Sequence, residues 1–300
     1  MIEVCLLGNG AMMPLPDRPL SAAAIRIGGE VILFDCGEGT QVAFRSTPFS
    51  FRALGTILIS HAHADHIAGL PGILFQIAHA TRVEPVRIIG PAGLQPVIEG
   101  LLTVVGGLPF ELRLQTLEGG DCVPLVANAT VTAIALQHRR ACLGYVIDLP
   151  RAPRFLPERA RELGVPIEYW RPLQDGFAIG GFRPEDVTGP PRKGLRVALV
   201  TDTVTFPELA EQLQGSDLLI CEATFVDDED EQRAIERGHM TMRQAADLAR
   251  ASNSRRLWLT HFSPKVLDPL AHQEAARALF PEAQIGYPGL CTELSFEDEV

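Results

Sequence analysis

A short stretch of the sequence, SHAHADHIAG at residues 60–69, holds three histidines and one aspartate within six positions. Imidazole nitrogen and carboxylate oxygen are donors that zinc accepts at about 2.0–2.2 Å. The chemistry expected here is therefore metal binding, and the alternatives are a single catalytic His–Asp pair or an accident of composition. One zinc ion takes at most four protein ligands, and this stretch alone offers four candidates, His61, His63, Asp65 and His66.

Three further donors follow in the chain, each at the end of an apolar run. His138 follows ATVTAIAL, Asp202 ends RVALVTD and His261 ends RLWLTH. In layered α/β proteins the ends of strands meet along one edge, where ligands and chemistry collect. A lone histidine at a strand end is usually a surface residue, but coincidence is a poor explanation for all three together with the cluster. We therefore expect a two-metal site.

Short apolar runs bounded by Gly, Pro or Ser predict the strands that must position these side chains. They lie at 4–8, 23–27, 31–35, 56–60, 86–90, 129–136, 143–148, 196–202, 218–223 and 256–261. Helices are predicted at 66–80, 92–105, 206–214, 241–252 and 271–280. The run TILIS ends at Ser60 and a helical pattern follows IAGLPG, so the histidine cluster is expected on a strand-to-helix loop.

Composition sets limits on the class of protein. The 300 residues are 46% hydrophobic and 21% charged, which allows a substantial core, and the net charge of -11 argues against nonspecific binding to nucleic acid. No apolar run approaches the ~20 residues that cross a bilayer, and the first residues lack signal-peptide features. We expect a cytoplasmic protein without a membrane segment. Six scattered cysteines with no CxxC pair predict reduced thiols.

Residues 151–194 differ from the rest of the chain. They are rich in Pro, Gly and Arg, show little strand periodicity, and hold eight basic against six acidic residues. Two interpretations remain open: a plain surface loop, or a protruding arm that meets an anionic partner. Because no linker divides the chain, we expect a single domain, 1–300, with this segment as an insertion.

Longer motifs extend over nearly the whole chain. They are LLGNGAMMPLP, FDCGEGTQ, SHAHADHIAGLPG, PEDVTGPPRKG, VTDT, CEATF, GHMTMRQAADLA and LTHFSP. Together they resemble the ribonuclease Z family, the metallo-β-lactamase-fold endonucleases that trim tRNA 3' ends. The histidine cluster is shared by that superfamily, whereas DCGEGTQ, GPPRKG and EATF are more specific to ribonuclease Z. The resemblance implies an α/β fold, a four-layer αββα sandwich of two mixed β-sheets with outer helices and an inserted arm.

The resemblance also implies which side chains hold two zinc ions per subunit, although such donors accept manganese or iron as well. The first ion is assigned to His61, His63 and His138, the second to Asp65, His66 and His261, with Asp202 bridging both. Two cations so placed lower the pKa of a bridging water and stabilise both oxygens of an in-line phosphoryl displacement.

Proton transfer is assigned by the same resemblance. Asp65 is expected to orient or deprotonate the water as well as to bind metal. His239 is expected to protonate the leaving 3'-oxygen, and Glu222 to orient the His239 ring. Asp35, at the end of a strand, is expected to support a metal ligand through a hydrogen bond.

The chain departs from the family pattern near the site only in small ways. Cys221 stands where the family has histidine in its H-E-A-T motif, a position not expected to bind metal. Ala62 and Ala64 replace a bulkier residue and a glycine. His79 and His272 lie outside every motif, and we interpret both as ordinary residues.

The arm departs more strongly. Its stretch GVPIEYWRPLQDG, residues 164–176, lacks the Gly-Pro step of the family, and Arg171 is its only basic residue. Tyr169 and Trp170 either stack on unpaired bases or pack within the arm.

The sequence therefore favours a zinc-dependent endoribonuclease that removes the 3' trailer of precursor tRNA and leaves a 3'-hydroxyl. The alternative is a phosphodiesterase of the same fold that acts on small cyclic or linear phosphodiesters, which the weak arm motif and the net charge favour. A noncatalytic binding protein would require lost ligands, and all seven are present. Family members are typically homodimers in which one subunit's arm serves the other's active site, so precursor tRNA and a second copy are the expected partners.

Overall fold

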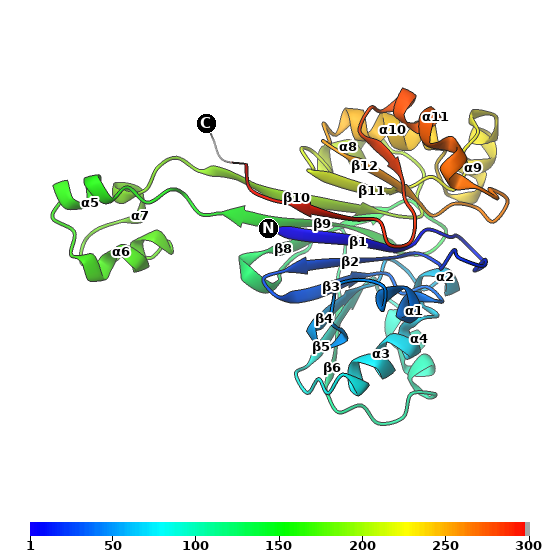
Figure 1. Cartoon of the computed structure of the whole chain (residues 1–300), viewed down its shortest axis with the longest axis horizontal. Coiled ribbons are helices and arrows are strands. Elements are labelled where there is room, and N and C mark those ends of the chain that lie inside the picture. Colours follow the sequence, from blue (N-terminus) through cyan, green and yellow to red (C-terminus); the bar gives the residue numbers. More distant parts are fainter. Residues whose placement is uncertain (298–300) are drawn as a thin grey trace.

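Two seven-stranded β-sheets pack face to face in the computed structural model, which describes residues 1–297 (Figure 1). The first sheet has the order Cys291–Leu294 (β14), Ile2–Gly8 (β1), Ala22–Ile27 (β2), Glu30–Phe34 (β3), Leu54–Leu58 (β4), Val86–Gly90 (β5) and Leu112–Thr116 (β6). The second sheet has the order Ala283–Ile285 (β13), Leu257–Thr260 (β12), Leu218–Glu222 (β11), Arg192–Val200 (β10), Cys142–Arg151 (β9), Thr130–Leu136 (β8) and Cys122–Pro124 (β7).

Both sheets are mixed. In the first, β14 to β3 pair antiparallel and β3 to β6 pair parallel. In the second, β7 to β10 pair antiparallel and β10 to β13 pair parallel. The ten predicted strands are present, whereas β6, β7, β13 and β14 were not predicted.

Helices cover the outer face of each sheet. Those of the body are Thr40–Phe44 (α1), Ala64–Ile67 (α2), Leu70–His79 (α3), Leu94–Leu102 (α4), Pro207–Gln212 (α8), Glu231–Arg237 (α9), Met242–Ala251 (α10) and Gln273–Leu279 (α11). No helix among residues 1–297 is long and apolar enough to cross a membrane.

Apolar side chains fill three layers between these elements. Phe34 and Tyr145 meet edge to face between the two sheets, with ring centroids 6.1 Å apart. Ile73 of α3 packs in the cluster outside the first sheet, and Ala245 and Ala249 of α10 pack in the cluster outside the second. The predicted four-layer αββα sandwich is therefore confirmed.

A disulfide joins the first and last strands of the first sheet. The register of β1 and β14 places Cys5 opposite Cys291, and the two are bonded. The expectation of six reduced cysteines was therefore wrong for this pair, because a sequence separation of 286 gives no local signal. Cys36, Cys142 and Cys221 are free and buried.

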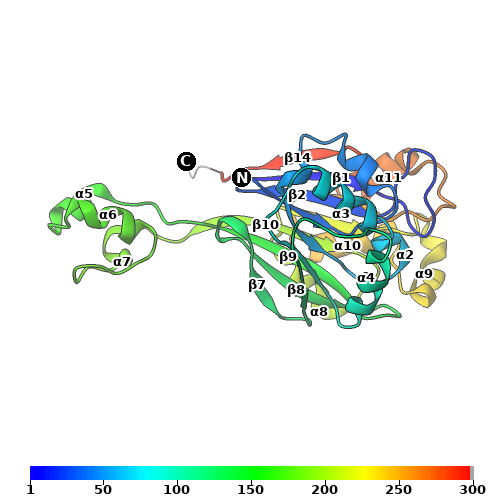
Figure 2. The same ribbon diagram turned by 90° about the horizontal axis from the view of Figure 1, so that it is seen from below.

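The segment between β9 and β10 projects from the body as an arm, defined here as residues 152–191 (Figures 1 and 2). It carries three short helices, Pro157–Glu162 (α5), Ile167–Gln174 (α6) and Pro184–Val187 (α7). Its core consists of Ala160, Val165, Leu173 and Val187. Trp170 packs against this core and donates its indole N–H to the Val165 carbonyl at 3.1 Å, so its ring serves packing.

Strand β10 runs from the arm to the opposite end of the second sheet. It begins at Arg192 beside the arm and ends at Val200, two residues before Asp202. Nine residues of strand span about 30 Å. The arm and the edge that carries Asp202 therefore lie at opposite ends of the sheet.

Candidate metal centre

The histidine cluster begins in the loop after β4 and continues into a helix. His61 and His63 lie in the loop, whereas Asp65 and His66 lie in the first turn of α2. The predicted loop is therefore correct for His61 and His63 and wrong for Asp65 and His66. Asp65 and His66 are therefore positioned by the helix, whereas His61 and His63 are positioned by the loop.

A close approach of backbones fixes α2 against the turn that follows β3. Cys36 N–H donates to the carbonyl of His66 and Gly69 N–H donates to the carbonyl of Cys36, both at 2.8 Å. A Cβ atom on Gly37 would lie 2.4 Å from the carbonyl oxygen of Asp65. Gly37, the first glycine of the DCGEGTQ motif, is therefore required for α2 to pack against the turn after β3.

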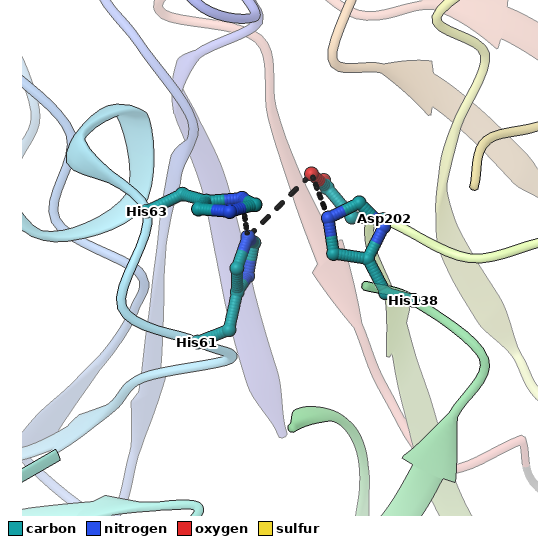
Figure 3. Close-up of side chains that lie close together, drawn as sticks. All are labelled: His61, His63, His138 and Asp202. Atoms are coloured by element: carbon teal, nitrogen blue, oxygen red, sulfur yellow. Dashed lines mark hydrogen bonds and ion pairs between the residues drawn. The ribbon is translucent and has the colours of Figure 1, made fainter. Parts of the chain in front are cut away.

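One group of donors lies at the ends of β4, β8 and β10 (Figure 3). It comprises His61, His63, His138 and Asp202. The Nε2 of His61 lies 2.7 Å from His63 Nδ1 and 3.6 Å from Asp202 Oδ2, and His138 Nε2 lies 3.7 Å from the same oxygen. Ligands of a tetrahedral zinc ion stand about 3.4 Å apart, so this spacing suits one ion.

A second group lies beside the first. It comprises Asp65, His66 and His261. The two imidazole Nε2 atoms are 3.1 Å apart, and Asp65 Oδ2 lies 3.7 Å from His66 and 3.5 Å from His261. Asp202 Oδ1 lies 3.3 Å from His66 and 3.2 Å from His261. Since Oδ2 of Asp202 faces the first group, its carboxylate stands between two ion-sized sites.

One of the donor atoms lacks the partner that a buried polar atom normally has. His138 donates from Nδ1 to the Gly238 carbonyl at 3.0 Å, which leaves the lone pair on Nε2. That Nε2 is buried and has no hydrogen-bond partner among the described residues. A cation bound by these imidazole and carboxylate groups supplies the missing partner, so the residues present fit metal ions.

Burial keeps the first group in the form that binds metal. Burial and then the neighbouring His66 lower the pKa of His61 to about 2. Burial is also the largest cause that lowers the pKa of His63 and of His138. These rings are therefore neutral at neutral pH and present lone pairs.

His66 behaves differently. Burial opposes its charge, but the carboxylates of Asp202 and Asp35 outweigh burial and raise its pKa well above the usual value. Metal binding at this position must therefore displace a proton from the ring. Burial likewise opposes the charge of Asp202, yet His261 and His66 hold its pKa well below the usual value.

A layer of hydrogen bonds orients the ligands. Asp35 accepts from Ser60 N–H and pairs with His66 Nδ1, both at 2.7 Å, as the sequence had suggested for a supporting carboxylate. The backbone N–H of Met12 donates to Asp65 Oδ2 at 2.7 Å. Met12, Asp35 and His261 have φ values of 63°, 53° and 59°. Such left-handed backbone at non-glycine residues concentrates at functional sites.

A histidine–glutamate pair lies next to the two groups. His239 Nδ1 is 3.1 Å and 3.2 Å from the two oxygens of Glu222, which is fully buried. Thr203 N–H also donates to Glu222, and Thr224 Oγ1 contacts Glu222 Oε2 at 2.6 Å and His261 Nδ1 at 2.9 Å. Burial opposes the charge of His239, but Glu222 outweighs it and raises the pKa of His239 to about 9.

The structure thus brings all nine predicted site residues to one edge. Six of them line one cavity, and the other three, His61, His66 and Glu222, contact members of that lining. His239 also forms a third donor group with Asp202 and His261, an alternative role as a ligand. Neither His79 nor His272 belongs to a donor group among residues 1–297. Sequence reasoning missed the links made by Thr224 and by the Met12 backbone. Thr224 belongs to the CEATF motif, which was used only for Glu222, whereas a backbone donor has no sequence signal.

Relatives of known sequence match the chain from end to end. The chain is 40% identical over 301 residues to the ribonuclease Z of Lachnoclostridium phytofermentans, with 99% of each covered. It is 39% identical over 303 residues to the ribonuclease Z of Agathobacter rectalis, with 100% of each covered. A family model described as a beta-lactamase superfamily domain matches residues 181–262, and one described as anti-Pycsar protein Apyc1 matches residues 2–105.

Solved structures share the fold. Human tRNase Z, short form, superposes with a TM-score of 0.70 at 25% identity, with 98% of this chain and all of that chain covered. A diphosphatase from the PhnP family has a TM-score of 0.68 at 17% identity, with 99% of each covered, and shares the fold alone. The metallo-β-lactamase fold predicted from the sequence is therefore confirmed.

Proposed function

The chain belongs to the ribonuclease Z family, and on that premise we propose that it is a metal-dependent endoribonuclease that cuts the 3' trailer from precursor tRNA and leaves a 3'-hydroxyl. The observation that carries the proposal is the position of Asp202, whose two oxygens face two separate groups of donors. A carboxylate in this position could bridge two cations, which would stabilise the attacking and leaving oxygens of an in-line displacement at a phosphodiester. The end-to-end match to ribonucleases Z supplies the substrate class.

We assign two zinc ions to this edge, with manganese or iron as other metals that such donors accept. His61, His63 and His138 would hold one ion, Asp65, His66 and His261 the other, and Asp202 both. When bound, two cations lower the pKa of a water molecule and neutralise charge on the phosphoryl oxygens.

The protein side chains supply the proton transfers. We assign to Asp65, whose Oδ2 accepts a hydrogen bond from the Met12 N–H, the role of orienting the attacking water and accepting its proton. Glu222 holds His239 through Nδ1, which turns Nε2 toward the cavity that the ligands line. With its pKa raised to about 9, His239 carries a proton at neutral pH and donates it from Nε2 to the leaving 3'-oxygen.

The arm is proposed to bind the folded part of the precursor tRNA. The arm lies at the far end of β10, about 30 Å from the metal ligands of its own subunit. A homodimer is proposed in which each arm serves the active site of the other subunit. The proposed compartment is the cytoplasm, on the match to ribonucleases Z.

One preparation tests the proposal against the alternative. Purified protein with zinc should cut a precursor tRNA once, beside the discriminator base, and should also hydrolyse a small chromogenic phosphodiester. Protein that cleaves only the small diester and ignores folded precursors would contradict the proposal and support a small-diester phosphodiesterase. That alternative is favoured by Arg171, the single basic residue of 164–176, which is already paired with Asp175 at 2.8 Å.

Deletion of the arm sharpens the same experiment. Arg151 and Arg192 are partners in the β9–β10 ladder, so a two-residue turn can replace residues 152–191 without disturbing either strand. The shortened protein should lose cleavage of precursor tRNA and keep hydrolysis of the small diester and its bound metal. Loss of both activities with normal metal content would show that the arm acts on the chemistry itself.

A further inference from the structure

Four cations surround the mouth of the cavity above the metal ligands. This cavity, of about 400 Å³, is lined by Arg139, Arg233, Arg237 and Lys265 in addition to the site residues. Its acidic lining residues are Asp65 and Asp202, which both belong to the donor groups. Apart from these two aspartates and the histidines, every charged residue of the lining is basic. The lining therefore differs from the chain as a whole, whose net charge is -11.

Three elements build this rim. Arg233 and Arg237 are four residues apart on α9 and therefore share one face of that helix. Arg139 follows β8 and donates to the carbonyl of Glu236 at 2.9 Å, which ties it to α9. Lys265 lies in the loop after β12 and lines the same cavity.

The protein leaves much of this charge uncompensated. Arg233 lies 3.6 Å from Asp230, a long contact between partly exposed groups. Within residues 1–297, Arg237 and Lys265 form no ion pair with any side chain, and the contact of Arg139 is to a carbonyl. Uncompensated cations around a cleft attract anionic ligands and hold them near it.

A second cavity continues the path beyond the rim. It has a volume of about 340 Å³ and shares Thr224, Phe225, Arg233, Ser263 and Lys265 with the first. Asp227 and Asp230 also line it. The cations that can hold phosphates are therefore those of the first cavity, with Arg233 and Lys265 at its boundary with the second.

We propose that Arg139, Arg233, Arg237 and Lys265 bind the phosphates that flank the scissile phosphate, so that a single RNA strand lies along the groove between α9 and the loop after β12. This inference rests on the proposed function. The donor groups receive the scissile phosphate, and its neighbours on the strand meet the rim. The rim thus makes the site selective for a polynucleotide over an isolated diester.

The experiment pairs removal of a cation with removal of a phosphate charge. Arg237→Gln and the triple variant R139Q/R233Q/R237Q are compared with wild type on precursor tRNA at several salt concentrations. KM should rise about tenfold in the triple variant, and the slope of log KM against log salt should fall by about 0.7 for each phosphate that is no longer neutralised. A neutral methylphosphonate next to the cut should raise the KM of the wild type for that substrate and should have little further effect on the KM of Arg237→Gln.

Controls separate this idea from the proposed function. Arg277→Gln on α11 removes an exposed cation outside both cavities and should leave KM and the salt slope unchanged. If the triple variant lowers kcat/KM for a small diester as much as for RNA, or if the methylphosphonate effect is the same in wild type and Arg237→Gln, the inference is overturned. If the wild type fails to cut precursor tRNA, inhibition of diester hydrolysis by a single-stranded RNA oligonucleotide decides instead. Equal inhibition of wild type and Arg237→Gln would then overturn it.

Discussion

The strand ends that carry the two donor groups, called the metal edge below, and the arm are built in opposite ways. At the edge, side chains from five strand ends converge, and contacts such as His66 to His261 span 195 residues of sequence. The arm has a core of four buried residues that all come from positions 160–187. The proposed chemistry therefore depends on the whole body, whereas the proposed recognition surface depends on a local unit joined through β9 and β10.

The two regions also differ in how far their side chains are buried. Asp35, Glu222 and Thr224 each make at least two hydrogen bonds inside the body and are buried. On the arm, Ile167 and Phe177 expose 77% and 68% of their surface. A change at the edge should therefore alter the reaction on any substrate, and a change in the arm only the reaction on large ones.

The largest effect is expected from a ligand at the edge. His63→Ala should remove bound metal and lower activity toward precursor tRNA and toward a small diester alike, by about 10³-fold or more, because metal stabilisation of several kcal/mol is lost. Metal content by elemental analysis and the two rates on one preparation measure this. His79→Ala, an exposed histidine on α3, is the matched control. Full activity in His63→Ala would refute the assignment of the first group.

A smaller effect, confined to turnover, is expected from the proton donor. His239→Ala should lower kcat by about 10²–10⁴-fold and leave metal content near normal. Loss of metal in this variant would instead make His239 a ligand, in line with the third donor group.

The pH dependence of kcat tests the same role of His239. Because Glu222 raises the pKa of His239 to about 9 against the effect of burial, the ring is protonated below that pH. kcat of the wild type should therefore fall as pH rises through the pKa of His239. In His239→Ala this alkaline limb should disappear, and a pH profile that is unchanged would show that the limb belongs to another group.

The smallest effect is expected inside the arm. Leu173→Ala removes a fully buried side chain from the arm core and should destabilise the arm by about 2 kcal/mol or more. Amide hydrogen exchange should rise in residues 152–191 only, with a higher KM for precursor tRNA and an unchanged rate on the small diester. Ile167→Ala on the exposed face of α6 is the control. Faster exchange throughout the body would break the distinction between the two regions.

The metal edge was predictable because its signals are local or repeated. Four donors occur within six positions, and His138, Asp202 and His261 each follow an apolar run that forms a strand. The links between donors were not predictable in the same way. The contact of Thr224 with His261 and Glu222 depends on the parallel pairing of β11 with β12, which no run of residues encodes.

Regular structure was missed where elements are short or lack an apolar face. Helix α6 carries Pro172 inside it, and Ala234 is the one buried residue of α9. Strands β13 and β14 have three and four residues, too few for an alternation to stand out. The pairing that brings Cys5 to Cys291 joins the two ends of the sequence, so it follows from topology and not from any motif.

That pairing of β1 with β14 has a consequence for synthesis on the ribosome. One edge of β1 is free from the moment it emerges until β14 has been translated, so the first sheet keeps an unpaired hydrogen-bonding edge during most of translation. The arm, whose core contacts all lie within about thirty residues, can form much earlier. The nascent chain should therefore carry a finished arm on an open body, and it should rely most on chaperones in the interval before its last strand closes the sheet.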